Sequence, residues 1–256
     1  MSNEIRAFDR IAADYDEQVL SNEILVWMRE QVHRIFLSYF KPRDSVLELN
    51  AGTGIDAEFL SKHGINVYAT DASERMIEKL RTRTKIHSEV LSFSDLNKIK
   101  GNFDGVISNF GGLNCINDFE DLSKDLYSKI KSGGKFVAVV MNKFCPWEVN
   151  YYLMKLKPRS AFRRFSKKGI DVGLNGSTVR AYYFTPRKFA RSFKKNFVLE
   201  KIYSLGLFTP PPYLQGLYRR FKIPVQLLMK IDAALRGIYP FNRFGDHFIV
   251  VLRKKM

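Results

Sequence analysis

The pattern of apolar and polar positions along the chain has two periods. Short, nearly continuous apolar runs typical of buried strands occupy residues 45–50, 65–70, 85–93, 103–109 and 135–141. Between these runs, apolar residues recur three and four positions apart, as they do on one face of a helix. Strands that alternate with helices predict βαβ units and a mainly parallel sheet, that is, a doubly wound α/β fold.

The segment before the first strand has helical periodicity. Apolar residues at helical spacing run through residues 4–40, and Lys41-Pro42 stops the pattern. We therefore expect helix over this whole segment. Another helix start is marked by Ser73, a good capping residue, with Glu74 in the first turn of the helix.

The regular alternation ends at Phe144. Residues 144–177 are aromatic and basic, and residues 209–245 form a second irregular insertion. Around these insertions we expect a strand or lid edge at 180–185, a helix opened by Pro186, and strands at 197–203 and 246–253. No long crossover helix separates the last two strands, so a seven-stranded sheet should finish antiparallel.

The first strand runs into a glycine-rich turn that contains Gly52 and Gly54. Glycines at such a turn let the backbone approach a ligand closely at the start of a helix. Asp71 lies 17 positions beyond Gly54, at the end of the second strand. There its carboxylate can accept both ribose hydroxyls of an adenosine. Either feature alone is ordinary in a strand-to-helix turn, but together at this spacing they predict a nucleotide site.

Polar residues also follow the third and fourth strands. Asp95 is followed by Leu96, and this pair suits an adenine. The amino group of an adenine can donate to the carboxylate, and the apolar side chain can cover the ring. Asn109 ends the fourth strand. Because the carboxyl ends of parallel strands meet at one edge of a sheet, these side chains should lie where open α/β sheets bind their ligands.

Several segments carry a more specific resemblance. They are FDRIAADYDE (8–17), VLELNAGTGIDAEFL (46–60), VYATDASERMIEKLR (67–81), SFSDL (92–96), FDGVISNFGGLNCI (103–116) and SGGKFVAVV (132–140). In this order they resemble the class I S-adenosylmethionine-dependent methyltransferases, especially the small-molecule group that includes the ubiquinone-biosynthesis C-methyltransferases. The resemblance implies a Rossmann-like methyltransferase fold with helical cap insertions, S-adenosyl-L-methionine as cofactor and a small-molecule methyl acceptor.

The resemblance also implies roles for single residues. Gly52 and Gly54 would pass under the methionine part of the cofactor. Asp71 would hold the ribose, and Ala72 and Met76 would line the adenine side.

The third and fourth strands would supply the rest of the cofactor site. By the same resemblance, Ser94, Asp95 and Leu96 would recognise the adenine. Asn109 and Phe110 would close over the methionine end.

One departure from the family's pattern falls in the glycine loop. The family usually has glycine where this chain has Asn50, and often cysteine where it has Ala51. Asparagine tolerates a positive φ better than most residues, so we expect the turn to survive. Asn50 and Ala51 are therefore included among the cofactor-binding residues, although their contact to the cofactor's carboxylate should differ.

The resemblance also implies the domain organisation, a single methyltransferase domain over residues 1–256. Residues 1–44 would form a helical lid from which Tyr15 reaches across the site, and residues 45–143 would form the cofactor-binding core. Residues 144–177 and 209–245 would be cap insertions on the substrate side.

Charge changes the picture for the second half of the chain. The net charge is +16, but residues 1–140 hold 18 Lys and Arg against 21 Asp and Glu, while residues 141–256 hold 24 against 5. Such asymmetry indicates an anionic partner, unless it is a solvated face that keeps the protein soluble. The two cysteines lack disulfide or metal-site spacing, and no secretory signal or membrane span is evident, so we expect no metal and a cytoplasmic location.

Two other function classes compete with a small-molecule methyltransferase. A dinucleotide-binding dehydrogenase would share the glycine turn and Asp71, but it explains neither Asp95 nor the long helical segment before the first strand. An RNA methyltransferase, or a basic RNA-binding protein on the same fold, would use the basic and aromatic residues of 155–168. The aliphatic residues of 213–236 favour instead a lipophilic acceptor and peripheral contact with an anionic membrane.

No catalytic residue is evident from the sequence. Methyl transfer from a sulfonium depends mainly on positioning and desolvation, and only some acceptors need a base. We expect structural roles for all four histidines, among them His33 and His247, and a packing role for Cys115.

Overall fold

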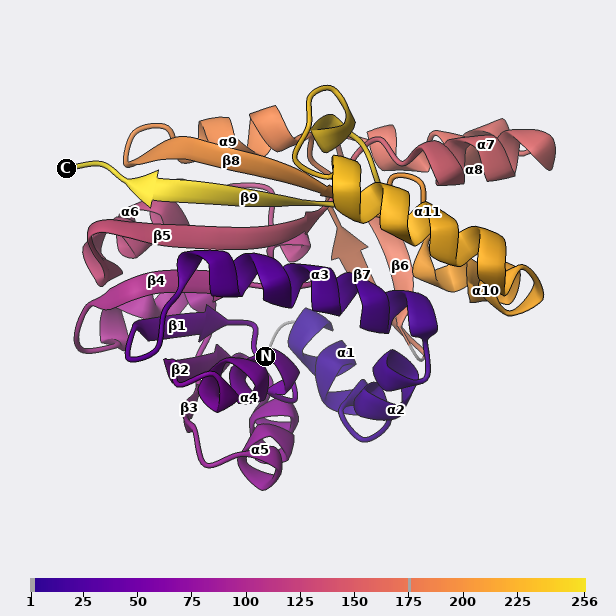
Figure 1. The fold of residues 1–256 in the computed structure, drawn as a ribbon. Coiled ribbons are helices and arrows are strands. Elements are labelled where there is room, and N and C mark those ends of the chain that lie inside the picture. Colours follow the sequence, from indigo (N-terminus) through magenta and orange to yellow (C-terminus); the bar gives the residue numbers. More distant parts are fainter. Residues whose placement is uncertain (1–2, 175) are drawn as a thin grey trace.

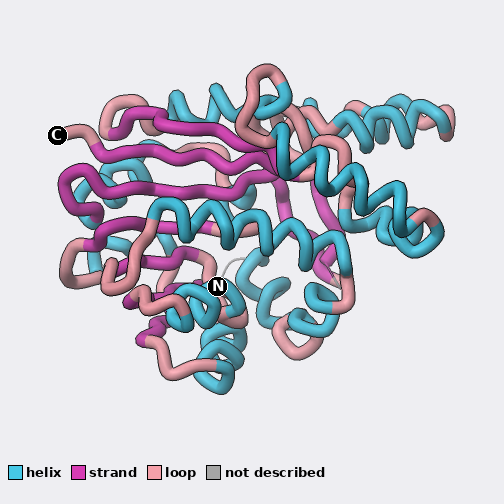
Figure 2. The backbone as a smooth tube through the Cα atoms, in the orientation of Figure 1, coloured by secondary structure: helices cyan, strands magenta, loops and turns pink. Residues whose placement is uncertain are grey.

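The computed structural model describes residues 3–174 and 176–256, and its centre is a large twisted sheet with helices on both faces (Figures 1 and 2). Within the described residues, seven strands form this sheet: β1 (Ser45–Leu49), β2 (Asn66–Asp71), β3 (His87–Val90), β4 (Phe103–Ser108), β5 (Ile130–Met141), β8 (Phe197–Leu205) and β9 (His247–Lys254). Their order is β3-β2-β1-β4-β5-β9-β8. Neighbours among β1 to β5 pair in parallel, and β9 is antiparallel to both β5 and β8. The doubly wound fold and its antiparallel finish are thus confirmed.

Helices bury their apolar sides on the two faces of the sheet. One face carries α3 (Glu23–Tyr39), α4 (Ile55–Lys62), α5 (Glu74–Arg83) and α11 (Lys222–Leu235). The other carries the 3₁₀ helix η1 (Phe93–Lys98), α6 (Glu120–Lys129) and α9 (Pro186–Ser192). Successive strand residues alternate between the faces: Val46 packs on the α3 side and Leu47 on the α6 side. Burial on both faces explains why these strands are nearly continuous apolar runs.

The N-terminal segment is not the single helix expected for residues 4–40. It divides into α1 (Asn3–Ile11), α2 (Tyr15–Leu20) and α3. Asn22 makes the second break, because its Oδ1 accepts hydrogen bonds from the backbone N–H groups of Ile24 and Leu25 and so caps α3. Its Nδ2 donates to the carbonyl of Pro212 at 3.0 Å, a contact across 190 residues that helical periodicity cannot register.

The two insertions contain more regular structure than their composition indicates. The first holds α7 (Pro146–Met154), α8 (Pro158–Ala161), η3 (Arg163–Phe165) and strand β6 (Ile170–Leu174). β6 pairs with β7 (Ser177–Ala181) in a separate two-stranded sheet, so the strand expected near 180–185 does not join the main sheet. The second insertion holds η4 (Pro212–Leu214), α10 (Gln215–Arg220), α11 and η5 (Phe241–Arg243). The remaining short helix, η2 (Gly112–Cys115), follows β4.

A buried ionic cluster fastens the first insertion to the sheet. The Arg164 guanidinium donates to Glu148 Oε2 at 2.8 Å and to Asp246 Oδ1 at 2.6 Å, and also to the carbonyls of Asn142 and Asp246. Tyr213, from the second insertion, donates to the same Glu148 oxygen at 3.1 Å. Burial alone would raise the pKa of Asp246, but the charge of Arg164 lowers it below its usual range. The cluster therefore joins both insertions to the ends of β5 and β9.

This cluster should make a large contribution to stability. Arg164→Met removes the buried cation that bridges Asp246 and Glu148 and leaves Glu148 paired only with the partly exposed Arg163, so we expect a loss of about 3–5 kcal/mol in the free energy of unfolding, measured by urea denaturation. Arg180→Met is the matched control, because Arg180 pairs with Asp171 at the exposed surface of the β6–β7 hairpin and should lose less than about 1 kcal/mol. Equal losses in the two variants would contradict a special role for the buried cluster.

Candidate functional site

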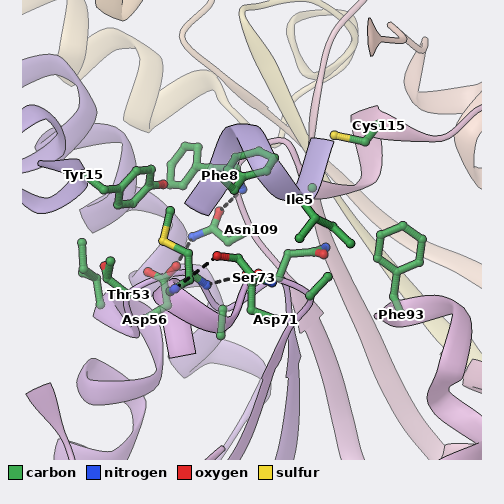
Figure 3. Close-up of a pocket in the computed structure, with 18 of the residues that line it drawn as sticks. Ile5, Phe8, Tyr15, Thr53, Asp56, Asp71, Ser73, Phe93, Asn109 and Cys115 are labelled. Atoms are coloured by element: carbon green, nitrogen blue, oxygen red, sulfur yellow. Dashed lines mark hydrogen bonds between the residues drawn. The ribbon is translucent and has the colours of Figure 1, made fainter. Parts of the chain in front are cut away.

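A pocket lies at the carboxyl ends of β1 and β4, where the strand order of the sheet reverses. The empty space within it is about 1050 Å³, counting the part open to solvent. Residues from α1, α2, α3, the glycine loop, the ends of β2, β3 and β4 and helix η2 line it. Figure 3 shows Tyr15 and Thr53 on one side, Phe93 and Cys115 on the other, and Asp71 and Asn109 between them.

The glycine loop keeps its left-handed turn. Asn50 has φ 55°, Gly52 has φ 56° and Gly54 has φ 81°, so asparagine does adopt the conformation expected of it. The Asn50 side chain donates to Ser108 Oγ at 3.1 Å and fills the space beside Gly112. A Cβ on Gly112 would lie 2.3 Å from Asn50 Nδ2, so the larger residue in the loop requires glycine opposite it.

Asp71 links this loop to the start of α5. Its Oδ2 accepts from Gly52 N at 2.9 Å and its Oδ1 accepts from Ser73 N at 2.8 Å. Burial raises the pKa of Asp71 above its usual value, and these backbone hydrogen bonds lower it only in part. The carboxylate is thus held rigidly in the pocket wall, and each oxygen can accept a further bond from a ligand.

Most of the residues predicted from the sequence come together in this pocket. Those that line it are Tyr15, Asn50, Ala51, Gly52, Asp71, Ala72, Met76, Asn109 and Phe110. Gly54 does not line the pocket but begins α4, where its lack of a Cβ admits Leu80, whose Cγ would lie 2.6 Å from such an atom. The remaining three, Ser94, Asp95 and Leu96, also lie outside the lining.

Ser94, Asp95 and Leu96 lie outside the pocket lining because of the local fold after β3. β3 ends at Val90, earlier than expected, and η1 begins at Phe93. The 3₁₀ turn buries Leu96 in the core beneath the sheet and directs Asp95 to an ion pair with Lys98 at 2.9 Å. Ser92 and Phe93 line the pocket in their place.

The sequence analysis missed a buried polar cluster in the pocket wall. Asp56, in the first turn of α4, accepts from Arg29 Nη1 at 2.5 Å and from Asn109 Nδ2 at 2.8 Å, and it lies 2.6 Å from His33 Nε2. Burial alone would raise the pKa of Asp56, but Arg29 and His33 lower it below its usual range. A signal was present, because Arg29 and His33 are four residues apart and share one face of a helix.

Glu48 of β1 belongs to the same buried region and behaves in the opposite way. Burial and the charge of Asp56 raise its pKa well above its usual value, and its Oε2 has no hydrogen-bond partner among the described residues. The pKa values of the two neighbouring carboxyls are thus shifted in opposite directions.

The N-terminal helices close the pocket from above. Ser73 donates to Asp9 of α1 at 2.5 Å, and Thr53 donates to Asp16 of α2. Tyr15 stands inside this closure, and burial raises the pKa of its phenol. α1 also meets the β6–β7 hairpin, where Arg10 Nη1 donates to Ser177 Oγ at 2.9 Å.

Comparison with known proteins places this site in a family. Residues 46–134 match the model of a family described as a methyltransferase domain. A demethylmenaquinone methyltransferase of Corynebacterium glutamicum is 32% identical over 168 residues, which are 60% of this chain and 68% of the relative. The chain belongs to the class I S-adenosylmethionine-dependent methyltransferases.

Other similarities agree with this membership of the methyltransferases. A demethylmenaquinone methyltransferase of Leptospira interrogans is 28% identical and covers 59% of this chain and 67% of its own length. The N-methyltransferase NodS of Bradyrhizobium japonicum, solved with S-adenosylhomocysteine, superposes with a TM-score of 0.64 at 12% identity over the full length of both chains. The 1,6-didemethyltoxoflavin-N1-methyltransferase of Burkholderia thailandensis, with its substrate and S-adenosylhomocysteine bound, gives 0.57 at 14% identity and covers 99% of this chain and 88% of its own. At these low identities the two solved structures show a shared fold.

The pocket of this methyltransferase fits its cofactor, S-adenosylmethionine. Arg29 lines the pocket, and its Nε is buried without a hydrogen-bond partner among the described residues, so a donor is left over for an anion such as a carboxylate. A Cβ on Gly52 would meet nothing within 4 Å, which leaves space beside the loop for a ligand. A cation for the carboxylate and an acid for the ribose, Asp71, are thus both in place.

The opposite pKa shifts of Glu48 and Asp56 predict opposite responses to pH. The pKa of Glu48 is raised on folding, so its contribution to stability is present below its unfolded pKa of about 4.3 and is lost as the pH rises towards the folded value. Glu48→Gln removes the ionisable group, so the variant does not lose this stability as the pH rises. The variant should match the natural chain near pH 4 and exceed it increasingly at higher pH, by up to about 1.4 kcal/mol per pH unit in urea denaturation.

The control for this experiment is Asp56→Asn. Because the pKa of Asp56 is lowered on folding, its contribution is present above about pH 3.9 and is lost in acid. Asp56→Asn leaves Arg29 buried without its counter-ion and should cost roughly 3–5 kcal/mol at neutral pH, less as the pH falls. A Glu48→Gln variant that is destabilised at neutral pH would mean that Glu48 is ionised and paired in the folded protein.

Proposed function

We propose that the pocket binds S-adenosylmethionine with its ribose on Asp71 and its methionine carboxylate on Arg29, and that the enzyme methylates a lipophilic small molecule of the quinone type. The adenine would lie between Ala72 and Phe93, beside Met76. The methionine end would lie over Gly52, near Asn50, Asn109 and Phe110. The observation that carries the acceptor class is the match to demethylmenaquinone methyltransferases over 168 residues.

The character of the pocket wall supports this kind of acceptor. The pocket lining also includes Ile5, Phe8, Phe110, Cys115 and Ile116, which are apolar or weakly polar. Such a wall suits an aromatic ring better than a charged or strongly hydrogen-bonding substrate.

The residues of the chain would contribute positioning and desolvation. When bound, the cofactor supplies an electrophilic methyl group on a sulfonium. Closure by α1 and α2 keeps water from the pocket, and the Arg29–Asp56 cluster fixes the wall against which the methionine end rests. A reduced quinone ring, activated by its hydroxyl groups, would attack through carbon and then lose the proton from that carbon.

We place the lid in residues 1–44, the cofactor core in 45–143 and the substrate cap in 144–177 and 209–245. The lid assignment is supported by the bonds of Asp9 and Asp16 across the pocket, and the cap assignment by the position of both insertions at the carboxyl edge of the sheet. A lipophilic acceptor of this kind would be met at a membrane, with the enzyme in peripheral contact. None of the described helices is long and apolar enough to cross a membrane.

The cofactor assignment is tested by Asp71→Ala. Loss of hydrogen bonds to a charged group should weaken binding of S-adenosylhomocysteine by about 1.5–3 kcal/mol, or roughly 10- to 150-fold, in titration calorimetry. Asp95→Ala is the informative comparison, because this carboxylate lies outside the pocket lining and pairs with Lys98. Unchanged affinity in folded Asp71→Ala would disprove the ribose contact, and an equal loss in Asp95→Ala would return adenine recognition to that residue.

The acceptor class is tested by labelled methyl transfer to naphthoquinones with prenyl tails of increasing length. Label should enter the reduced quinols but not the oxidised quinones, because only the electron-rich hydroquinone ring is a carbon nucleophile. Activity should rise as the tail lengthens from none to a few units. Transfer of label to RNA, with none to any quinol, would overturn the proposal in favour of an RNA substrate.

A further inference from the structure

Two helical hairpin tips expose large apolar side chains to solvent. The first tip is the α7–α8 turn, where Met154 is 86% exposed and Leu156 is 89% exposed. The second is the α10–α11 turn, where Ile223 is 80% exposed and Phe221 is also exposed. Further exposed apolar side chains flank the two tips: Leu153, Phe162, Phe165, Tyr213 and Leu227. Scattered single apolar residues need no explanation, but two such groups at turn tips do.

Both tips are also basic. The first carries exposed Lys155, Lys157 and Arg159, and the second carries exposed Arg219, Arg220, Lys222 and Lys230. The sequence has no acidic residue from 149 to 170 or from 201 to 231. The charge excess of the second half of the chain is thus concentrated where the apolar residues are most exposed.

The tips project in the same direction. In Figure 1, α7 with α8 and the turn between α10 and α11 both extend to the right, past the carboxyl ends of the strands. Their bases are held together, since Tyr213 bonds Glu148 and Trp147 Nε1 donates to the carbonyl of Phe208 at 2.6 Å. The buried Arg164 bonds Glu148 at the base of the first tip and Asp246 just before β9, so the bases of the two tips are held against each other and against the sheet.

We propose that these two tips, residues 153–165 and 213–230, are a docking surface for an anionic phospholipid membrane, with Met154, Leu156, Phe221 and Ile223 entering the headgroup region. Basic residues beside apolar ones are what an anionic lipid surface binds, and each basic residue near such a surface adds about fivefold to the affinity. The most exposed residues are mainly aliphatic, which suits acyl chains better than stacking on nucleic-acid bases.

The inference rests on the proposed function for its purpose, which is to bring a lipophilic acceptor to the edge of the sheet where the pocket lies. Its test does not depend on methyl transfer. The full-length protein is floated with phosphatidylcholine vesicles that contain or lack phosphatidylglycerol, at increasing salt. We expect binding only to the anionic vesicles, and weaker binding as salt screens the charges.

Variants at the tips separate the apolar from the basic contribution. Met154→Asp with Ile223→Asp should reduce vesicle binding by about tenfold or more, and so should Lys155→Ser, Lys157→Ser and Arg159→Ser together. Val198→Asp, on an exposed apolar residue of β8, and Arg191→Ser, Lys194→Ser and Lys195→Ser, on and beyond α9, are the matched controls and should bind as the natural chain does. Circular dichroism confirms that each variant is folded.

The outcomes distinguish this surface from the proposed function. None of the substituted tip residues lines the pocket, so tip variants should lose far more rate on acceptors embedded in vesicles than on a tail-less soluble naphthoquinol. If no quinol is methylated but the tips still govern vesicle binding, the acceptor class fails and the surface stands. The surface is disproved if folded tip variants bind vesicles normally. It is also disproved if the natural chain ignores anionic vesicles while binding RNA, or while forming a dimer through the tips.

Discussion

The cofactor pocket depends on one buried carboxylate, that of Asp56. It is the common acceptor for groups from α3 and from the end of β4, and it stands in the first turn of the helix that follows the glycine loop. A buried charge is tolerated only when it is paired and hydrogen-bonded, so the positions of Arg29, His33 and Asn109 are all constrained by it. The charge of Asp56, together with burial, also raises the pKa of Glu48 on β1.

Much of the fold follows from patterns that are local in sequence. The parallel strands β1, β4 and β5 are largely buried on both faces, so their apolar runs predict them well, whereas β3 at the edge of the sheet has only Ser88 buried and is shorter than its predicted run. The helix capped by Ser73 also appears as predicted, with the Ser73 hydroxyl accepting from Met76 N. The same locality accounts for most of the pocket, because residues at strand ends such as Asn50, Asp71 and Asn109 are brought together by any parallel sheet with this strand order.

What the sequence could not predict depends on contacts between distant residues. Asn22, which caps α3, also bonds the carbonyl of Pro212, and the second insertion packs on α3 and the sheet through Val225 and Met229 of α11. Asp95 and Leu96, predicted to recognise the adenine, lie outside the pocket lining for a different reason. A 3₁₀ turn and a short irregular strand end differ little in energy. The burial of Leu96 decides which side of the turn faces the pocket.

Two buried arginine–carboxylate centres, built on Asp56 and on Arg164, organise the two ends of the site. Contacts run between them without a gap: His247 Nδ1 lies 3.0 Å from Asp246, its ring meets that of Phe110 at 5.6 Å, and the Arg29 guanidinium lies 4.9 Å from the Phe110 ring centroid.

A continuous chain of contacts does not by itself couple two sites, because coupling needs an element with two discrete arrangements. Its physical consequence is rigidity. Neither arginine can shift without weakening the pairing of a buried carboxylate, so these contacts favour one fixed geometry for the two insertions and the pocket. An enzyme that accelerates its reaction mainly by positioning depends on just such a fixed relation between the wall that holds its cofactor and the wall that receives its acceptor.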